Sequence, residues 1–266
     1  MADPAVVAEL ERRAAVLRGH VVTIATHGLT HVGGSVSAAD LMAALFFHSL
    51  RFDGPHPDHF ILSKGHAVHI LHSCLVERGL IDASELETCG QPGSRLGGHP
   101  TMRAPGVEFA TGSLGHGLSV GTGIALAEQL RGSGARTVVL MGDGEQQEGT
   151  VWEAALAAPR FGLEGLVAIV DANRIQAMGR VEDLIPVEPL ADKWRAFRWN
   201  VHEIDGHDMG AIVDALDAAP AAGGGPTAII AHTVKGKGIA GMEDTTAVHY
   251  MQFTPEAAAD AKRALA

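Results

Sequence analysis

The second half of the chain alternates short apolar segments with amphipathic ones, and this alternation constrains the fold more than any other feature. Residues 137–141 and 166–170 are aliphatic runs of strand length, and a helical pattern at 149–161 separates them. Strands that are apolar on both faces and joined by helices are typical of a parallel sheet covered on both sides. We therefore expect an α/β fold, a three-layer sandwich with a mainly parallel central sheet, as a single domain over residues 1–266.

The remaining elements follow from the same two periodicities. Gly-rich residues 28–36 and the loop-rich stretch 82–117 interrupt the pattern, and residues 221–225 read as a short flexible loop rather than a domain linker. The other predicted strands are 59–62, 200–204 and 227–231, and the other predicted helices are 5–18 (with a possible continuation over 21–26), 38–49, a segment ending near Gly79, 118–131 and 208–218.

Composition and charge exclude several classes of partner. The net charge of −11 argues against binding to nucleic acid or to an anionic membrane surface. The longest strongly apolar run, 41–47, is far shorter than the roughly 20 residues of a membrane span. Only Cys74 and Cys89 are present, and the first residues lack a basic stretch followed by an apolar one. We expect a cytoplasmic protein without disulfides.

Polar residues follow two of the predicted strands. Asp143, between Gly142 and Gly144, comes after one strand, and Asn173 comes after the next. A right-handed helical crossover brings two such strand ends together at the carboxyl edge of the sheet, where ligands bind. Mg²⁺ prefers oxygen donors, and glycines let a phosphate approach the backbone. The sequence therefore predicts a site for Mg²⁺ and a diphosphate.

Gly-Asp-Gly followed by asparagine resembles the thiamine diphosphate motif, and further stretches make the chain similar to transketolases. The resemblance covers almost the whole chain but only the first, diphosphate-binding domain of that family. The stretches occur in the order of the family: His31–Ser35 (HVGGS), Ser63–Ala67 (SKGHA), Gly97–Pro100 (GGHP) and Thr111–Gly117 (TGSLGHG).

The resemblance implies a role for each matching residue. Mg²⁺, or another divalent cation such as Ca²⁺ or Mn²⁺, would be held by the side chains of Asp143 and Asn173 and by the backbone carbonyl of Ile175. Glu148 matches an acidic residue at the interface between subunits. The cofactor-binding residues implied are His66, Gly112, Ser113, Leu114, Gly142, Asp143, Gly144, Glu148, Asn173 and His249, with Gly112 to Leu114 along the thiamine rings.

Four histidines match residues that act on the substrate in this family. His66 and His249 would reach the diphosphate and the reacting carbon, and His31 and His99 would contact sugar hydroxyls and assist proton transfer. Imidazoles suit that task because their ordinary pKa lies near neutrality. Two positions depart from the family: His116 replaces a common glutamine, and Ala-Val-His-Tyr around His249 replaces Trp-His-Gly.

The implied activity is transfer of a two-carbon ketol unit from a ketose, or its phosphate, to an aldose. The resemblance does not extend to the second domain of the family, which there supplies a glutamate to the aminopyrimidine ring and most of the basic residues that hold sugar phosphates. We therefore expect a companion subunit with the pyrimidine-binding domain, in an α2β2 assembly. The small residues Gly117, Gly121 and Ala125 on helix 118–131 would pack closely on another helix or form that interface.

Four alternatives compete with this interpretation. Another thiamine diphosphate enzyme, such as the α chain of a 2-oxo acid dehydrogenase, would share the Asp143 and Asn173 pattern. A serine hydrolase would use Ser119, which lies in a G-x-S-x-G pattern without the preceding strand that a nucleophile elbow needs. A metal-binding module would use His66, His69 and His72. A regulatory relative would bind the cofactor without turnover.

Overall fold

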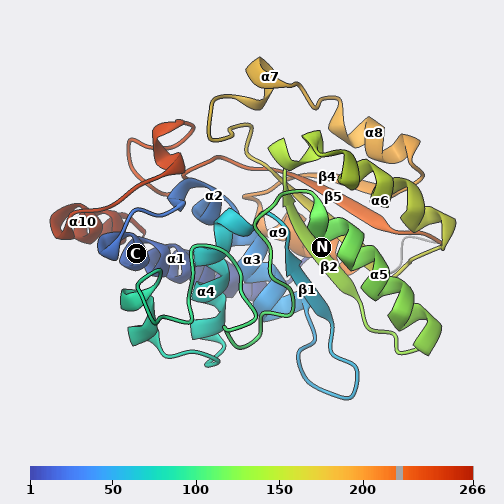
Figure 1. Ribbon diagram of the computed structural model, residues 1–266, viewed down its shortest axis with the longest axis horizontal. Coiled ribbons are helices and arrows are strands. Elements are labelled where there is room, and N and C mark those ends of the chain that lie inside the picture. The colour runs from blue at the N-terminus through green and yellow to red at the C-terminus, as the bar shows by residue number, and fades with distance from the viewer. Residues whose placement is uncertain (220–223, 266) are drawn as a thin grey trace.

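A five-stranded sheet, with every neighbouring pair of strands parallel, lies at the centre of the molecule (Figure 1). The computed structural model describes residues 1–219 and 224–265. The strand order is β1-β2-β3-β5-β4. The strands are β1 (His59–Leu62), β2 (Thr137–Gly142), β3 (Leu166–Ala172), β4 (Asn200–Asp205) and β5 (Thr227–His232).

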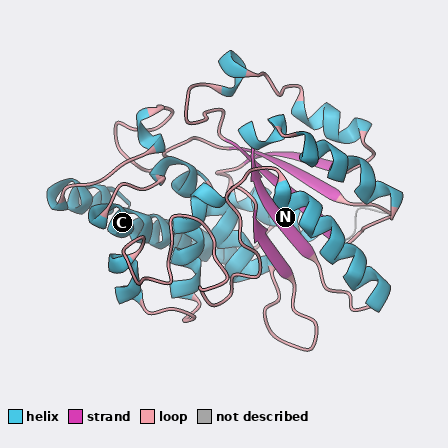
Figure 2. Cartoon of the chain, viewed as in Figure 1, coloured by secondary structure: helices cyan, strands magenta, loops and turns pink. Residues whose placement is uncertain are grey.

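Alternate residues of each central strand enter two different hydrophobic cores. In β2, Val138 and Leu140 belong to one core, and Val139 and Met141 belong to the other. Successive side chains of a strand point to opposite faces, so a strand that is apolar at every position requires cover on both sides. The structure provides that cover and confirms the predicted three-layer α/β fold (Figure 2).

Two groups of helices form the outer layers. The first core includes side chains from α1 (Pro4–His27), α2 (Val32–Ser37), α3 (Ala39–Ala44), α4 (Val68–Glu77), α9 (Met209–Ala218) and α10 (Pro255–Leu265). The second core includes side chains from α5 (His116–Arg131), α6 (Gly149–Arg160) and α8 (Leu190–Ala196). A short helix, α7 (Val181–Leu184), lies beyond the sheet in Figure 1. Within the described residues no helix has the length and apolarity needed to cross a bilayer.

Several predicted helix bounds need correction. The first helix continues through the possible extension to His27, and the predicted helix 38–49 divides into α3 and a wider π-helical turn at Leu45–Ser49. The glycine-rich stretch 28–36 contains helix α2, because tertiary packing outweighs its low helix propensity: a Cβ on Gly33 would lie 2.7 Å from Val248 Cγ1. Residues 221–223 of the loop predicted at 221–225 lie outside the described residues.

The small-residue face of α5 packs on the sheet. Gly117, Gly121 and Ala125 are all buried. A Cβ on Gly121 would lie 2.5 Å from Val139 Cγ2 of β2, and one on Gly117 would lie 2.4 Å from Ser63 Oγ. The prediction that this face packs on another helix or on a companion chain is therefore wrong, since the sheet and the residue that follows β1 already occupy it.

Candidate functional site

A cavity of about 250 Å³ opens at the carboxyl ends of β2 and β3. Parallel sheets place their ligands at this edge. The cavity brings together most of the residues predicted from the sequence, which come from separate stretches of the chain. These lining residues are His31, His66, Gly112, Leu114, Gly142, Asp143, Gly144, Asn173, Ile175 and His249.

Three predicted site residues lie outside this lining. His99 lies in an adjoining pocket, with its ring centroid 5.7 Å from that of His31. Ser113 is exposed on the loop between Gly112 and Leu114. Glu148 is also exposed, and its Cβ would lie 2.7 Å from a Cβ on Gly115 at the start of α5.

Asp143 is a buried carboxylate that, among the described residues, receives hydrogen bonds only from backbone N–H groups. Its side chain accepts from Gly144 N at 2.7 Å and from Arg174 N. Burial raises the pKa of Asp143 to about 6, and the neighbouring Asp171 charge adds to the rise. Among the described residues no basic side chain forms an ion pair with Asp143. A carboxylate in this state suits a divalent cation, which would supply the missing positive charge.

Asn173 lies beside Asp143 at the end of the adjacent strand. Its Oδ1 accepts from Ile175 N at 3.2 Å, and its Nδ2 donates to Asp171 Oδ2 at 3.1 Å. The register of the sheet explains the proximity, because Gly142 of β2 is paired with Asp171 of β3. The predicted meeting of the two strand ends is confirmed.

Sequence reasoning missed the charge network beneath these residues. Asp171 is fully buried, forms an ion pair with Lys64 Nζ, and accepts hydrogen bonds from Ser37 Oγ at 2.7 Å and from Thr233 Oγ1. Burial alone would raise the pKa of Asp171, but the Lys64 charge and these hydrogen bonds hold it below its ordinary value. A charged residue inside an otherwise aliphatic strand was the available signal, because such a group requires a buried partner.

Lys235 is the second residue that the sequence analysis missed. Its Nζ donates to the carbonyl of Ile175 at 2.6 Å and contacts His249 Nδ1 at 2.8 Å. Burial, together with the charge of Lys64, lowers the pKa of Lys235 to about 8. Its position shortly after β5, at the same sheet edge as Asp143, was the signal that could have identified it.

Three predicted catalytic histidines surround the mouth of the cavity. The ring centroid of His31 lies 5.6 Å from that of His66 and 5.4 Å from that of His249. Burial, with the charges of His99 and Lys235, lowers the pKa of His31 to about 4, and burial with Lys235 does the same for His249. Burial and Lys64 move the pKa of His66 well below its ordinary value. All three rings are therefore neutral near pH 7, and each can accept one proton.

The cavity also has the features of an anion site. Gln176 Nε2 is buried without a hydrogen-bond partner among the described residues, and Gln176 lines the cavity. A Cβ on Gly144 would lie 2.8 Å from Gln176 Cγ, so a larger residue there would displace the Gln176 side chain. With Lys64 and Lys235 also in the lining, the donors present fit a diphosphate bridged to a divalent cation.

The serine hydrolase alternative has no support in this geometry. Ser119 lies inside α5 and its Oγ donates to Thr150 O at 3.4 Å. A nucleophile elbow requires a sharp turn between a strand and a helix, and residues 117–121 are helical.

Comparison with known proteins identifies the family. Residues 13–266 match the family model described as "Transketolase, thiamine diphosphate binding domain". A subunit of the apulose-4-phosphate transketolase of Phocaeicola vulgatus is 41% identical over 238 residues, which cover 88% of this chain and 85% of that protein. The 6-deoxy-6-sulfo-D-fructose transketolase subunit SqwG of a Clostridium species is 40% identical over 255 residues, which cover 93% of each chain.

Solved transketolases share the whole fold of this chain. The transketolase of Leishmania mexicana superposes with a TM-score of 0.88 at 28% identity, covering all of this chain and 41% of that one. This chain therefore spans less than half of that transketolase but most of the length of the two relatives above. These matches confirm the family and the transferase class predicted from sequence: the chain belongs to the transketolase family and contains its thiamine diphosphate binding domain.

Proposed function

We propose that this chain is the N-terminal, diphosphate-binding subunit of a transketolase made of two polypeptides, which moves a two-carbon ketol unit from a ketose to an aldose. The observation that carries the proposal is the cavity at the strand ends, where Asp143 and Asn173 lie beside a group of neutral histidines. Residues 1–266 act as one diphosphate-binding domain in this proposal.

The cofactor is held at the edge of the sheet. Mg²⁺, or Ca²⁺ or Mn²⁺ in its place, would be held by the side chains of Asp143 and Asn173 and the carbonyl of Ile175, because hard cations prefer these oxygens. Gly142 and Gly144 allow the diphosphate to approach the backbone, and Gln176 and Lys235 add donors. Gly112, Ser113 and Leu114 contact the rings. Thiamine diphosphate supplies a nucleophilic carbon and an electron sink.

The histidines handle the protons of the reaction. His31 and His99 would contact the sugar hydroxyls, and His66 and His249 would reach the diphosphate and the reacting carbon. Making and breaking a carbon–carbon bond beside a carbonyl requires protons to move on and off oxygen, and a neutral imidazole accepts them. His31, His66 and His249 could also donate protons where a nearby negative charge raised their pKa.

A companion subunit with the pyrimidine-binding domain completes the site in an α2β2 assembly. Two of the relatives that this chain matches along most of its length are themselves named as transketolase subunits. Glu148, exposed beside the start of α5, faces the companion in this proposal. The substrates of those two relatives carry a phosphate in one name and a sulfonate in the other, so we propose an anionic ketose as the donor here.

The test is to assay ketol transfer by the chain alone, by its companion alone and by the two together. We expect transfer only from the mixture, and only with thiamine diphosphate and a divalent cation. A panel of ketose phosphates and sulfonated ketoses identifies the donor. Full activity of the lone chain would contradict the two-subunit proposal, and activity of the mixture without cofactor would contradict the assigned chemistry.

A further inference from the structure

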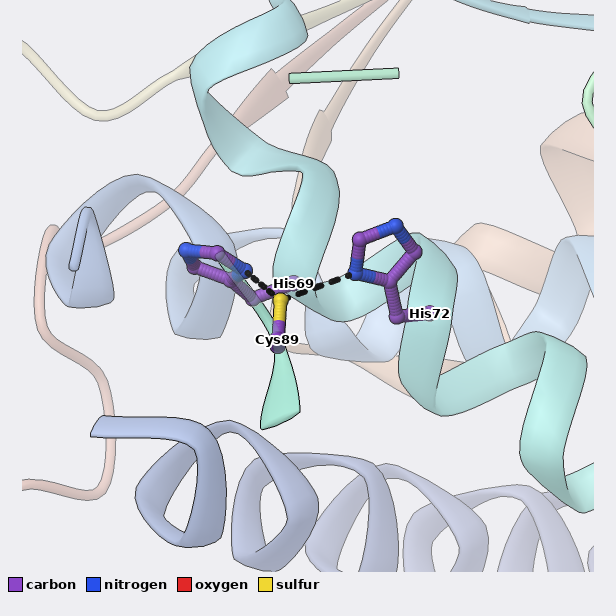
Figure 3. Close-up of side chains that lie close together, drawn as sticks. All are labelled: His69, His72 and Cys89. Carbon is purple, nitrogen blue, oxygen red and sulfur yellow. Dashed lines mark hydrogen bonds between the residues drawn. The ribbon is translucent and has the colours of Figure 1, made fainter. Parts of the chain in front are cut away.

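Two histidines and a cysteine converge at a place that the transketolase site does not use. His69 and His72 lie on α4, and Cys89 lies just after the 3₁₀ turn at Ala83–Thr88 (Figure 3). Both Nδ1 atoms point at the cysteine sulfur, which is 3.9 Å from that of His69 and 3.7 Å from that of His72. One donor atom from each residue lies within 4.8 Å of the other two.

We propose that His69, His72 and Cys89 bind a zinc ion. Imidazole nitrogen and thiolate sulfur are the donors that zinc selects in proteins. With a metal–sulfur bond of about 2.3 Å and a metal–nitrogen bond of about 2.0 Å, angles between tetrahedral and trigonal place sulfur and nitrogen about 3.5–3.8 Å apart. The two observed sulfur–nitrogen separations match this range within about 0.2 Å.

The burial of the two rings supports the site. His69 is 2% exposed and His72 is 0% exposed. Nε2 of His72 has no hydrogen-bond partner among the described residues, and its Nδ1 has only the weak contact with sulfur. A buried nitrogen whose contact is only a weak one costs free energy, and an ion bound at Nδ1 would remove that cost.

A neighbouring pocket gives access to the cluster. A pocket of about 310 Å³ is lined by His69 and Cys89, and also by His31, His99 and Tyr250. Zinc and its ligands can therefore be reached from solvent, and a water can complete the coordination. Cys89 Sγ also contacts Gly97 O at 3.8 Å, so the ion would fasten α4 to the segment that leads to His99.

The site is separate from the oxygen-rich cavity. His66 points into that cavity with His31 and His249, so the grouping of His66, His69 and His72 considered from sequence is wrong. Cys89, and not His66, is the third member of the cluster. Sequence spacing did not indicate this residue, because a loop separates Cys89 from α4. Zinc binds the thiolate, so the thiol proton of Cys89 passes to solvent when the zinc–sulfur bond forms.

Cobalt(II) binding to the full chain tests the proposal. Cobalt gives a thiolate-to-metal charge-transfer band, which oxygen donors at Asp143 do not produce. We expect one equivalent of Co²⁺ to give the band and Zn²⁺ to abolish it by displacement. The variants Cys89→Ser and His72→Gln should weaken binding more than about tenfold and lose or shift the band. The variants Asp143→Ala and Cys74→Ala should retain it, and a band that survives Cys89→Ser overturns the proposal.

A second measurement uses the unaltered protein and does not depend on how the variants fold. Cys89 is half-buried and Cys74 is fully buried, so alkylation followed by mass spectrometry reports mainly on Cys89. Stoichiometric Zn²⁺ should slow alkylation of Cys89 more than about tenfold, whereas Mg²⁺ should not. Equal alkylation rates with and without Zn²⁺ contradict the site, whatever the outcome of the transketolase assay.

Discussion

At the scale of single residues, the site depends on charges that the sheet keeps away from water. Lys64 is 0% exposed and Asp171 is 0% exposed, and each is tolerable only because the other is present. Asp143, directly after the paired residues of β2, has no such partner among the described side chains. The charges of Lys64 and Asp171 therefore balance each other, and Asp143 remains a carboxylate available to a cation.

Replacement of Asp143 by alanine should remove cation-dependent cofactor binding and leave the fold unchanged. Calorimetry with thiamine diphosphate and Mg²⁺, on the complex of both subunits, should show affinity reduced more than about tenfold, because the carboxylate oxygens are lost. Asp183→Ala, which removes an exposed carboxylate of α7, is the control and should bind normally. Unchanged affinity in Asp143→Ala rejects the assigned cation site.

Replacement of Lys64 by methionine should destabilise the chain by about 3–5 kcal/mol, since it leaves the Asp171 carboxylate buried without its cation. Denaturant unfolding measures the loss, and the double variant Lys64→Met/Asp171→Leu should recover part of it. Arg195→Met breaks an exposed ion pair with Asp192 and should change stability by less than about 1 kcal/mol. Equal effects of the buried and exposed variants would show that burial of the pair is unimportant.

Prediction from sequence succeeded at residues whose neighbours are set by strand order alone. Asp143 and Asn173 meet because adjacent parallel strands end together. Lys235 and Asp171 were missed because their partners lie far along the chain: Lys235 contacts Ile175 and His249 through side-chain reach, not through sheet register. Such contacts depend on how loops fold over the sheet, which periodicity does not specify.

At the scale of secondary-structure elements, close approach between α5 and the sheet fixes the position of the loop that precedes the helix. Gly121 allows the helix backbone to reach Val139, and Gly117 allows it to reach Ser63. The loop from Gly112 to Leu114 lies at the cavity and leads into α5. Because α5 cannot move away from the sheet without exposing the second core, the position of this loop is fixed. Glycine inside a helix costs about 1 kcal/mol relative to alanine, and here close packing offsets that cost.

Two glycines of the same helix should respond in opposite directions to alanine. Gly121→Ala should lower the free energy of unfolding by about 1–3 kcal/mol, because the added Cβ would lie 2.5 Å from Val139 Cγ2. Gly123→Ala, on the exposed face with nothing within 4 Å, should raise it by up to about 1 kcal/mol. Thermal and denaturant unfolding measure both, and stabilisation by Gly121→Ala would contradict the packing.

The strands were easier to predict than the helices. Every predicted strand is present. The central strands were predictable because a short run of aliphatic residues is typical of a strand buried on both faces. Four helices were not predicted: α2, α7, α8 and α10. Of these, α2 is glycine-rich, and α8 is short and lies in a region without clear periodicity. Both have buried side chains against the body of the molecule, so tertiary contacts, not local preference, stabilise them.

At the scale of the whole molecule, the buried histidines connect stability to acidity. The pKa of His31 and of His249 falls from the ordinary value of 6.5 to about 4 in the folded chain. Between these values the unfolded chain binds more protons, so the stability they contribute is complete above about pH 6.5 and is lost as pH falls toward 4. His66, whose pKa is also lowered, acts in the same direction.

Thermal unfolding as a function of pH should therefore show a midpoint that falls steadily between about pH 6.5 and about pH 4. In His31→Gln this fall should be shallower, since one proton-binding group of the unfolded chain is removed. His56→Gln changes an exposed histidine and is the matched control, with a profile expected to follow the parent. A His31→Gln profile that is parallel to the parent over this range contradicts the assigned pKa shift.

The division of each strand between two cores has a consequence for how this molecule can change over evolutionary time. Deleting or inserting one residue within β3 would rotate every later side chain of that strand to the opposite layer and remove Asp171 from Lys64. Variation in length is therefore confined to the connections between elements, such as residues 51–58, where an extra residue shifts no side chain from one layer to the other. In β3 the alternation of side chains between the two layers restricts changes in length as strongly as side-chain chemistry restricts substitutions.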